Sequence, residues 1–162
     1  MEQFLMEKGT VKVVTGPVDL DTGANTGARV DIQQFARVSF IVAAAAGTTP
    51  SAHTHTLRQH DAATAGNSKD LSVSNPYYHK VNAATSFTKV VPSSDTAAYD
   101  IDTVVGDTKY MVVFEVLAEQ LDRENGFRWV SLDTTDAGGA QLGTVIAVCH
   151  EAESKPAYSI IV

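Results

Sequence analysis

The sequence is poor in cysteine and contains no long apolar run. Cys149 is the only cysteine among 162 residues, so no disulfide can form within the chain. No stretch approaches the roughly 18 consecutive apolar residues of a membrane-spanning helix, so we expect no such span. Residues 1–8 contain acidic side chains and lack an apolar core, so we expect no signal peptide.

Charged residues, and basic residues above all, are scarce. The chain has 12 lysines and arginines against 19 aspartates and glutamates, a formal net charge of −7, and no basic cluster. Binding through nucleic-acid phosphates needs such a cluster, so we do not expect nucleic acid as a partner. Charged residues make up 19% of the chain, below the roughly 25% of ordinary soluble domains. Because interface cores are depleted of charge, this composition indicates a surface that lies against another protein.

What the sequence does contain favours strands. Valine, threonine and alanine are plentiful, and apolar residues make up 44% of the chain, enough for the core of one domain. Short apolar or alternating segments bounded by turn residues predict strands at 10–15, 37–43, 53–60, 77–80, 87–91, 97–101, 110–116, 127–132, 142–150 and 158–162. Gly16 and Pro17 are expected to end the first of these strands.

Helical structure is expected only in short turns. Asp61 stands where it can cap one helical turn through Ala65, and the segment from Ala118 starts like a helix and ends in an Asn-Gly turn. No amphipathic helix separates the strands, as a βαβ fold would require. We therefore predict an all-β, single-domain antiparallel β-sandwich, jelly-roll-like, with at most short helical turns. Residues 1–9 are expected to form an N-terminal arm and residues 10–162 the domain.

Two histidines in one predicted strand are candidate metal ligands. His53 and His55 are two residues apart, so their side chains project from the same face. Two imidazoles at this spacing can bind one metal ion, with His60 or Asp61 as a third ligand. The alternative is an exposed His-Thr-His-Thr surface with Leu57 pointing inward. The spacing leaves open a metal- or carbohydrate-binding β module, but we assign no metal ligand and no cofactor.

No pattern in the sequence is typical of an enzyme. It has no Gly-x-Ser-x-Gly nucleophile elbow and no glycine-rich phosphate loop that leads into a helix. Glu115 and Asp133 are the only acids in clear strand context, and a glycosidase-like pair would need both to point inward from neighbouring strands. Cys149 lies in a predicted strand, where a buried packing residue is expected. We therefore expect no catalytic residues and no enzymatic activity.

Two segments carry landmarks of a known family. In the segment 57–71 a strand ends in Leu-Arg-Gln, a polar turn holds a glycine, and Lys-Asp-Leu follows. In the segment 118–130 a Leu-Asp pair precedes a Gly-Phe turn and a strand that contains valine. This pattern resembles small structural proteins of tailed bacteriophages, over residues 37–71 and 110–150, about half of the chain. The His-Thr-His run and His60 depart from the pattern, because small or apolar residues are more usual there.

The resemblance implies a virion protein, most like a capsid decoration (cement) protein that binds capsomers and stabilises the capsid from outside. Its implied partners are the major capsid protein and further copies of this chain, a trimer being one such assembly, with neither nucleic acid nor membrane. Its implied location is the capsid surface of a virion assembled in the host cytoplasm. A tail, neck or fibre component is the alternative within the same class. We also expect residues 1–8 or the loop 48–52 to contact a neighbouring subunit.

Overall fold

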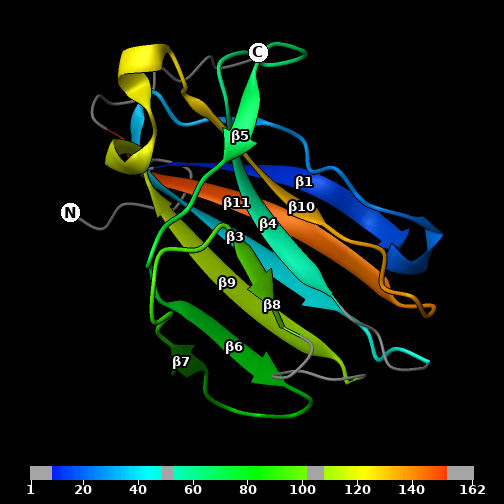
Figure 1. Cartoon of the computed structure of the whole chain (residues 1–162). Coiled ribbons are helices and arrows are strands. Elements are labelled where there is room, and N and C mark those ends of the chain that lie inside the picture. Colours follow the sequence, from blue (N-terminus) through cyan, green and yellow to red (C-terminus); the bar gives the residue numbers. More distant parts are fainter. Residues whose placement is uncertain (1–8, 49–52, 102–107, 153–162) are drawn as a thin grey trace, which may run out of the picture.

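The structure, a computed structural model, describes residues 9–48, 53–101 and 108–152 (Figure 1). Its strands are β1 (Thr10–Asp19), β2 (Val30–Asp31), β3 (Phe35–Ala44), β4 (Thr54–His60), β5 (Ser68–Asp70), β6 (Tyr77–Val81), β7 (Thr88–Val90), β8 (Ala98–Asp100), β9 (Tyr110–Leu117), β10 (Trp129–Thr134) and β11 (Leu142–Ala152). Single 3₁₀ turns occur at η1 (Leu20–Thr22), η2 (Ala118–Gln120) and η3 (Arg123–Asn125). The described residues contain no α-helix.

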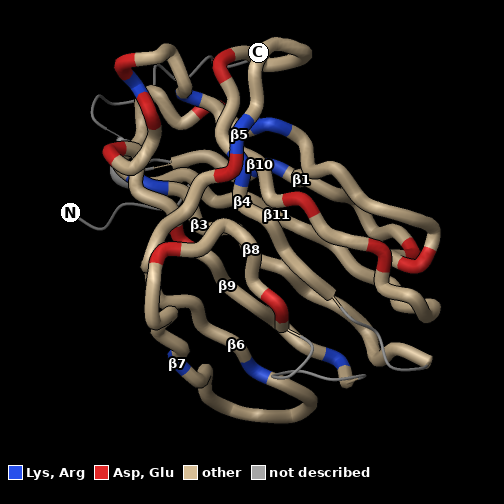
Figure 2. The backbone as a smooth tube through the Cα atoms, viewed as in Figure 1, with Lys and Arg blue, Asp and Glu red and all other residues tan. Residues whose placement is uncertain are grey.

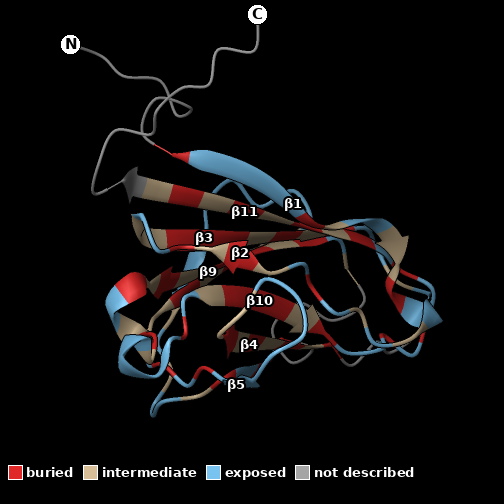
Figure 3. Ribbon diagram, turned by 90° about the horizontal axis from the view of Figure 1, so that it is seen from above, coloured by how far each residue is buried: buried red, intermediate tan, exposed pale blue. Residues whose placement is uncertain are grey.

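The strands form two antiparallel sheets that pack face to face (Figure 3). The larger sheet has the order β1-β11-β3-β9-β6-β7. The smaller sheet has the order β2-β10-β4-β5, and β8 pairs with the first half of β4 on the same edge as β5. The predicted all-β sandwich with only short helical turns is therefore confirmed.

The core lies between the sheets and follows from the period-two alternation of strand side chains. In β9 the buried residues alternate strictly with half-buried ones, and β3 and β11 alternate in the same way over most of their length. The largest fully buried side chains come from both sheets, among them Phe40 and Phe114 of the larger sheet and Leu57 and Leu132 of the smaller one. Full burial of a side chain of this size contributes about 1.5–3 kcal/mol to folding.

An aromatic cluster fills the middle of this core. The ring of Phe114 lies 4.9 Å from that of Tyr99 and 5.6 Å from that of Tyr77, measured between centroids. Tyr77 comes from β6 of the larger sheet and Tyr99 from β8 of the smaller one. Tilted and edge-on ring pairs at such distances contribute about 0.5–1.5 kcal/mol each beyond area burial. The short strand β8 is thus attached to the core by its central residue.

Two local predictions were wrong. The first strand does not end at Gly16: β1 continues through Pro17 to Asp19, with register shifts against β11 on the way. Because β1 is an edge strand, a proline there removes no hydrogen bond from the interior of the sheet. Residues 61–65 form no helical turn. The carboxylate of Asp61 instead accepts hydrogen bonds from the backbone and side-chain amides of Asn67, which closes the β4–β5 loop.

Other predictions fall partly or wholly outside the described residues. The segments 1–8 and 48–52, which were expected to contact a neighbouring subunit, lie outside the described residues except for residue 48. The predicted strand at 158–162 also lies outside them. The Asn-Gly turn is confirmed, because Gly126 adopts a left-handed conformation with φ of 83°. The strands β2 and β5 were not predicted, because segments of two and three residues are too short to show a periodicity.

Candidate interaction surface

The outer face of the larger sheet carries a continuous row of apolar side chains. Directly paired residues of antiparallel strands point to the same face. From the β1 edge across the sheet, five apolar residues pair in turn: Val13 with Ile146, Ile146 with Ile41, Ile41 with Val113, and Val113 with Tyr78. We call these five residues the apolar row. The row crosses β1, β11, β3, β9 and β6, and therefore nearly the whole width of the sheet.

The apolar row is half-buried except for the exposed Val13, and two further exposed apolar residues lie on the same face. Val11 pairs with Val148 beside the row, and Leu142 lies on the outer face at the start of β11. Val13 is 58% exposed and Leu142 is 63% exposed. Together with Val11, they are three of the five large apolar residues exposed in the described part of the chain. A contiguous exposed apolar patch on a soluble domain marks a site of interaction.

Four polar side chains on this face are joined by a chain of hydrogen bonds that runs in one donor-to-acceptor direction. Arg37 Nε donates to His150 Nδ1 at 3.0 Å, His150 Nε2 lies 3.0 Å from Ser39 Oγ, and Ser39 Oγ donates to Glu115 Oε1 at 3.0 Å. Because arginine has no acceptor, Nδ1 must accept the first bond and the ring proton is carried on Nε2. His150 therefore donates to Ser39 Oγ and cannot act as the base that removes the proton of the serine.

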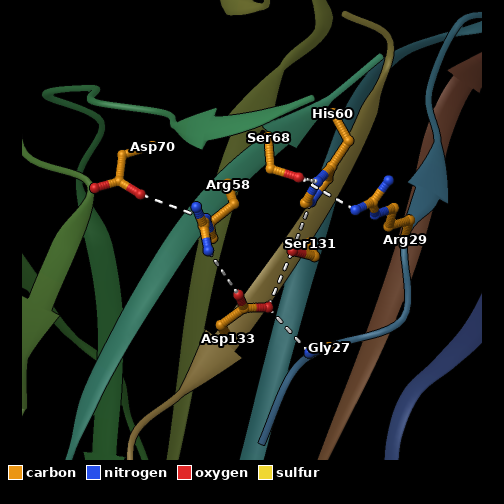
Figure 4. Close-up of polar contacts among 8 residues, drawn as sticks. All are labelled: Gly27, Arg29, Arg58, His60, Ser68, Asp70, Ser131 and Asp133. Carbon is orange, nitrogen blue, oxygen red and sulfur yellow. Dashed lines mark hydrogen bonds and ion pairs between the residues drawn. The ribbon is translucent and has the colours of Figure 1, made fainter. Parts of the chain in front are cut away.

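The outer face of the smaller sheet has a different character: it is polar and internally paired (Figure 4). Arg58 lies between two carboxylates, 3.4 Å from Asp70 and 3.9 Å from Asp133. Asp133 Oδ1 also accepts from the backbone N–H of Gly27 and from Ser131 Oγ, both at 3.0 Å. These contacts attach the loop before β2 to the middle of β10.

His60 continues this polar network (Figure 4). Its Nδ1 lies 2.6 Å from Ser68 Oγ and its Nε2 lies 2.9 Å from Ser131 Oγ. Burial, with the nearby charges of Arg29 and Arg58, lowers the pKa of His60 to about 4. The ring is therefore neutral at pH 7, with one nitrogen donating and the other accepting, and its role is to join β4, β5 and β10.

The two outer faces thus differ in kind. Charged residues gather in the loops and on the smaller sheet, whereas β11, β3 and β9 contain few of them (Figure 2). The polar groups of the smaller sheet bond to one another, while the apolar row is covered by no described residue of the chain. The face of the larger sheet is accordingly the candidate functional surface.

The structure corrects the interpretation of His53 and His55. Both lie on one strand face, as predicted, but that face points into the core, and both side chains are fully buried. Leu57 has the same parity and shares this face, so the exposed His-Thr-His-Thr surface was wrong. His55 Nδ1 lies 2.9 Å from Thr134 Oγ1, and burial, with a smaller effect of His53, lowers the pKa of His55 to about 3. His60 lies on the opposite face of β4 and is not a third ligand.

Other sequence candidates are also separated. Glu115 belongs to the outer face of the larger sheet and Asp133 to that of the smaller sheet, so the core lies between the two carboxylates. Cys149 is fully buried, as predicted, and burial raises the pKa of its thiol to about 11. Across residues 9–48, 53–101 and 108–152, no three His, Cys, Asp or Glu side chains gather as metal ligands would.

The two segments 57–71 and 118–130, by contrast, meet in space. Lys69 of β5 forms an ion pair with Asp122, and its ammonium lies 4.5 Å from the ring centroid of Phe127. Gln59 Oε1 accepts from the backbone N–H of Asp122 at 2.9 Å. These four residues, which we call the clasp, join β4 and β5 to the segment between β9 and β10. The landmark residues therefore have a structural role.

The apolar row was missed by the sequence analysis, although a signal for it was present. An antiparallel strand with one solvated face alternates between apolar and polar residues. The segments 37–43 and 142–150 instead carry apolar residues at positions of both parities, including Ile41 and Ile146. Strands with this pattern are typical of sheets that are buried on both faces. In the sandwich, the larger sheet packs against the smaller sheet on one face only.

No family model and no curated protein matches this chain. Among solved structures, it is similar to the SPBc2 prophage-derived protein YomS, with 11% identity and a TM-score of 0.38 over 86% of this chain and 92% of that chain. At this TM-score the likeness assigns neither a fold family nor a function to this chain. In the described residues, no helix is long and apolar enough to span a membrane.

Proposed function

We propose that this chain is a non-enzymatic virion structural protein of a tailed phage, which decorates and stabilises the capsid by binding capsomers through the outer face of its larger sheet. The observation that carries the proposal is the apolar row, Val13–Ile146–Ile41–Val113–Tyr78, which no described residue covers. The phage assignment itself rests on the landmark residues at 57–71 and 118–130.

The physical basis of such binding is burial of the row against a partner. Each Å² of apolar surface removed from water contributes about 25 cal/mol, so burial of the row, which spans five strands, would stabilise each contact. On a symmetric lattice the same contact repeats at every equivalent site. If copies are also joined to one another, their contacts act together, and firm attachment follows from modest affinity per copy.

The arrangement of polar groups supports a non-enzymatic role. The direction of the Arg37–His150–Ser39–Glu115 chain excludes His150 as the base for the serine, and no histidine-activated nucleophile is formed there. A carbohydrate- or metal-binding module was the alternative from another class, and it depended on accessible His53 and His55. Their full burial removes its premise.

The test compares capsid shells and tails from particles that lack this protein. The test variant combines Ile41→Thr, Val113→Thr and Ile146→Thr, which keep β-branched side chains while making the row polar. The control combines Thr56→Ser and Ala98→Ser on the outer face of the smaller sheet. We expect wild type and control to co-sediment with shells, and the test variant to bind at least about tenfold more weakly, a loss of about 1.4 kcal/mol.

Each alternative has its own outcome. Binding to tails and not to shells would move the protein to the tail, neck or fibre. Equal shell binding by the test variant and wild type would reject the apolar row as the contact surface. Binding to neither structure would overturn the virion assignment. Circular dichroism and thermal unfolding of all variants show that the substitutions leave the fold intact.

A further inference from the structure

One end of the larger sheet has an acidic corner at its β1 edge. Asp19 is the last residue of β1, and Asp21 follows in η1. Asp136 lies in the loop between β10 and β11. The next residue of this loop, Ala137, donates its backbone N–H to the carbonyl oxygen of Leu20 in η1 at 3.0 Å. None of these three carboxylates forms an ion pair with a described lysine or arginine. Leu142, paired with Asp19, adds an exposed apolar side chain.

The same end of the sheet has a lysine corner at its β6–β7 edge. Lys80 and Lys109 line one pocket. Lys89 of β7 pairs with Tyr78 of β6, which lies two residues before Lys80 on the same face of the strand. Phe87, 43% exposed, lies under the ammonium of Lys80, which is 5.0 Å from the ring centroid. None of the three lysines forms an ion pair with a described carboxylate.

The strand register shows that the two corners lie at the same end of the sheet, at its opposite edges. Gly143 of β11 pairs with Ala44 of β3, Ala44 pairs with Tyr110 of β9, and Tyr110 pairs with Val81 of β6. Strands lie about 4.8 Å apart, so the corners are about 20 Å apart on opposite edges of one sheet. Figure 2 shows acidic residues at the far end of β1 and basic residues around β6 and β7.

We propose that copies of this chain associate head to tail, with the acidic corner of one copy (Asp19, Asp21, Asp136 and Leu142) against the lysine corner of the next (Lys80, Lys89, Lys109 and Phe87). The contact is heterologous: it joins two different surfaces and generates a closed ring or an open row. It goes beyond capsid binding, because it concerns contacts between copies and does not depend on what the apolar row binds.

Charge complementarity selects a second copy as the occupant. The chain has a net charge of −7, so most pairings of its surfaces would bring carboxylates together. The lysine corner is a site where an exposed aromatic ring coincides with three lysines that form no ion pair within the described part of the chain. The acidic corner offers the matching set: an exposed leucine and three carboxylates that form no ion pair with a described residue. Opposite potentials steer association and set its register.

The geometry of this contact also keeps the apolar rows available. The two corners lie at opposite edges of the larger sheet, so copies joined through them stand side by side. Their outer faces can then point in one direction. The association therefore leaves the apolar row of every copy exposed to a common surface, whereas a face-to-face dimer would cover it.

Charge reversal tests the proposal by light scattering after size exclusion. One variant carries Lys80→Glu, Lys89→Glu and Lys109→Glu, and a second carries Asp21→Lys and Asp136→Lys. A third combines all five substitutions. Asp19 is left intact because its carboxylate accepts backbone N–H bonds from Asp21 and Gln141. The control, Glu119→Lys with Glu124→Lys, makes the same change in net charge as the second variant at exposed positions away from both corners.

We expect wild type and control to form oligomers at low salt that dissociate near 1 M salt, where the Debye length is about 3 Å. The first and second variants should be monomers, and the fully reversed variant should recover the wild-type mass. A wild type that stays monomeric at high concentration overturns the proposal. So does an oligomer that survives both partial reversals, which would indicate contact through the apolar row. Capsid binding by the monomeric variants is measured separately, so failure here is distinct from failure of the proposed function.

Discussion

The ammonium of Lys69 pairs with the carboxylate of Asp122, which is 53 residues further along the chain. The pair joins the short edge strand β5 to the turn between η2 and η3. The same carboxylate accepts two bonds from the side-chain amide of Asn125, at 2.9 Å each. The hydrogen bonds from Lys69 and Asn125 lower the pKa of Asp122 below its ordinary value. The two landmark segments are thus held together at one carboxylate.

The first prediction concerns this carboxylate. Asp122→Asn should lower the urea midpoint at neutral pH, because the amide cannot replace the ionised acceptor. A carboxyl group with a depressed pKa stabilises the fold above its unfolded pKa, and this stability is lost as pH falls through the folded pKa. The difference from wild type should therefore shrink in acid.

The matched control is Glu124→Gln, an exposed acid in η3 that makes none of these contacts. It should leave the midpoint unchanged within error at both pH values. A pH-independent loss in Asp122→Asn would show that the carboxylate's charge does not stabilise the clasp.

The second prediction concerns the buried imidazole of His55, whose pKa is about 3. Between pH 6.5 and this value the unfolded chain binds a proton that the folded chain does not, so stability falls as pH falls. Between pH 6.5 and pH 4 the titration of His55 lowers the free energy of unfolding by about 3 kcal/mol. Burial also lowers the pKa of His60, so His60 changes the stability in the same direction. In His55→Gln the dependence of the unfolding free energy on pH should be weaker by the contribution of His55, and the contribution of His60 should remain. Leu57→Ala, which removes no titrating group, should keep the wild-type slope.

The third prediction uses two neighbouring residues on opposite faces of β9. Phe114 is buried among Tyr77, Tyr99 and His55, so Phe114→Ala should cost about 3–5 kcal/mol of unfolding free energy. Val113 belongs to the half-buried apolar row, so Val113→Ala should cost about 1 kcal/mol or less. Denaturant unfolding measures both. Similar losses in the two variants would mean that the outer face is covered in solution.

The fourth prediction concerns Ser39. Since His150 donates to Ser39 Oγ, the histidine cannot activate the serine as a base, and we expect that a fluorophosphonate probe does not label the native protein. Intact-mass spectrometry detects one added phosphonyl group. Stoichiometric labelling that disappears in Ser39→Ala, but not in the control Ser131→Ala, would contradict both the inferred proton position and the non-enzymatic proposal.

The fifth prediction concerns the thiol of Cys149. Burial raises its pKa from 9.0 to about 11, which lowers the thiolate fraction about 100-fold near neutral pH. Its reaction with an aromatic disulfide reagent should therefore be at least about 100-fold slower in the native protein than in urea. Cys149→Ser, which cannot react, gives the baseline. Equal rates in the two conditions would show that β11 opens readily.

Much of the fold could be predicted because strand signals are local. The segments that became β3, β4, β9, β10 and β11 each contain enough β-branched and apolar residues to show their state without knowledge of their partners. The failures were also local in origin. A proline was treated as the end of a strand, although at the sheet edge it costs no interior bond, and Asp61 closed a loop with Asn67 instead of capping a helix.

The candidate surface could not be predicted, because it depends on which strands are neighbours. The sequence by itself determined that strands would form, that their side chains would alternate, and that His53 and His55 would share a face. Only the tertiary structure decided which face was the core, since one buried face of β4 and one of β9 must pack together. The same pairing aligned Val13, Ile146, Ile41, Val113 and Tyr78, which lie far apart in the chain, into one row. Alternation is a property of the chain, whereas inside and outside are properties of the packed sheets.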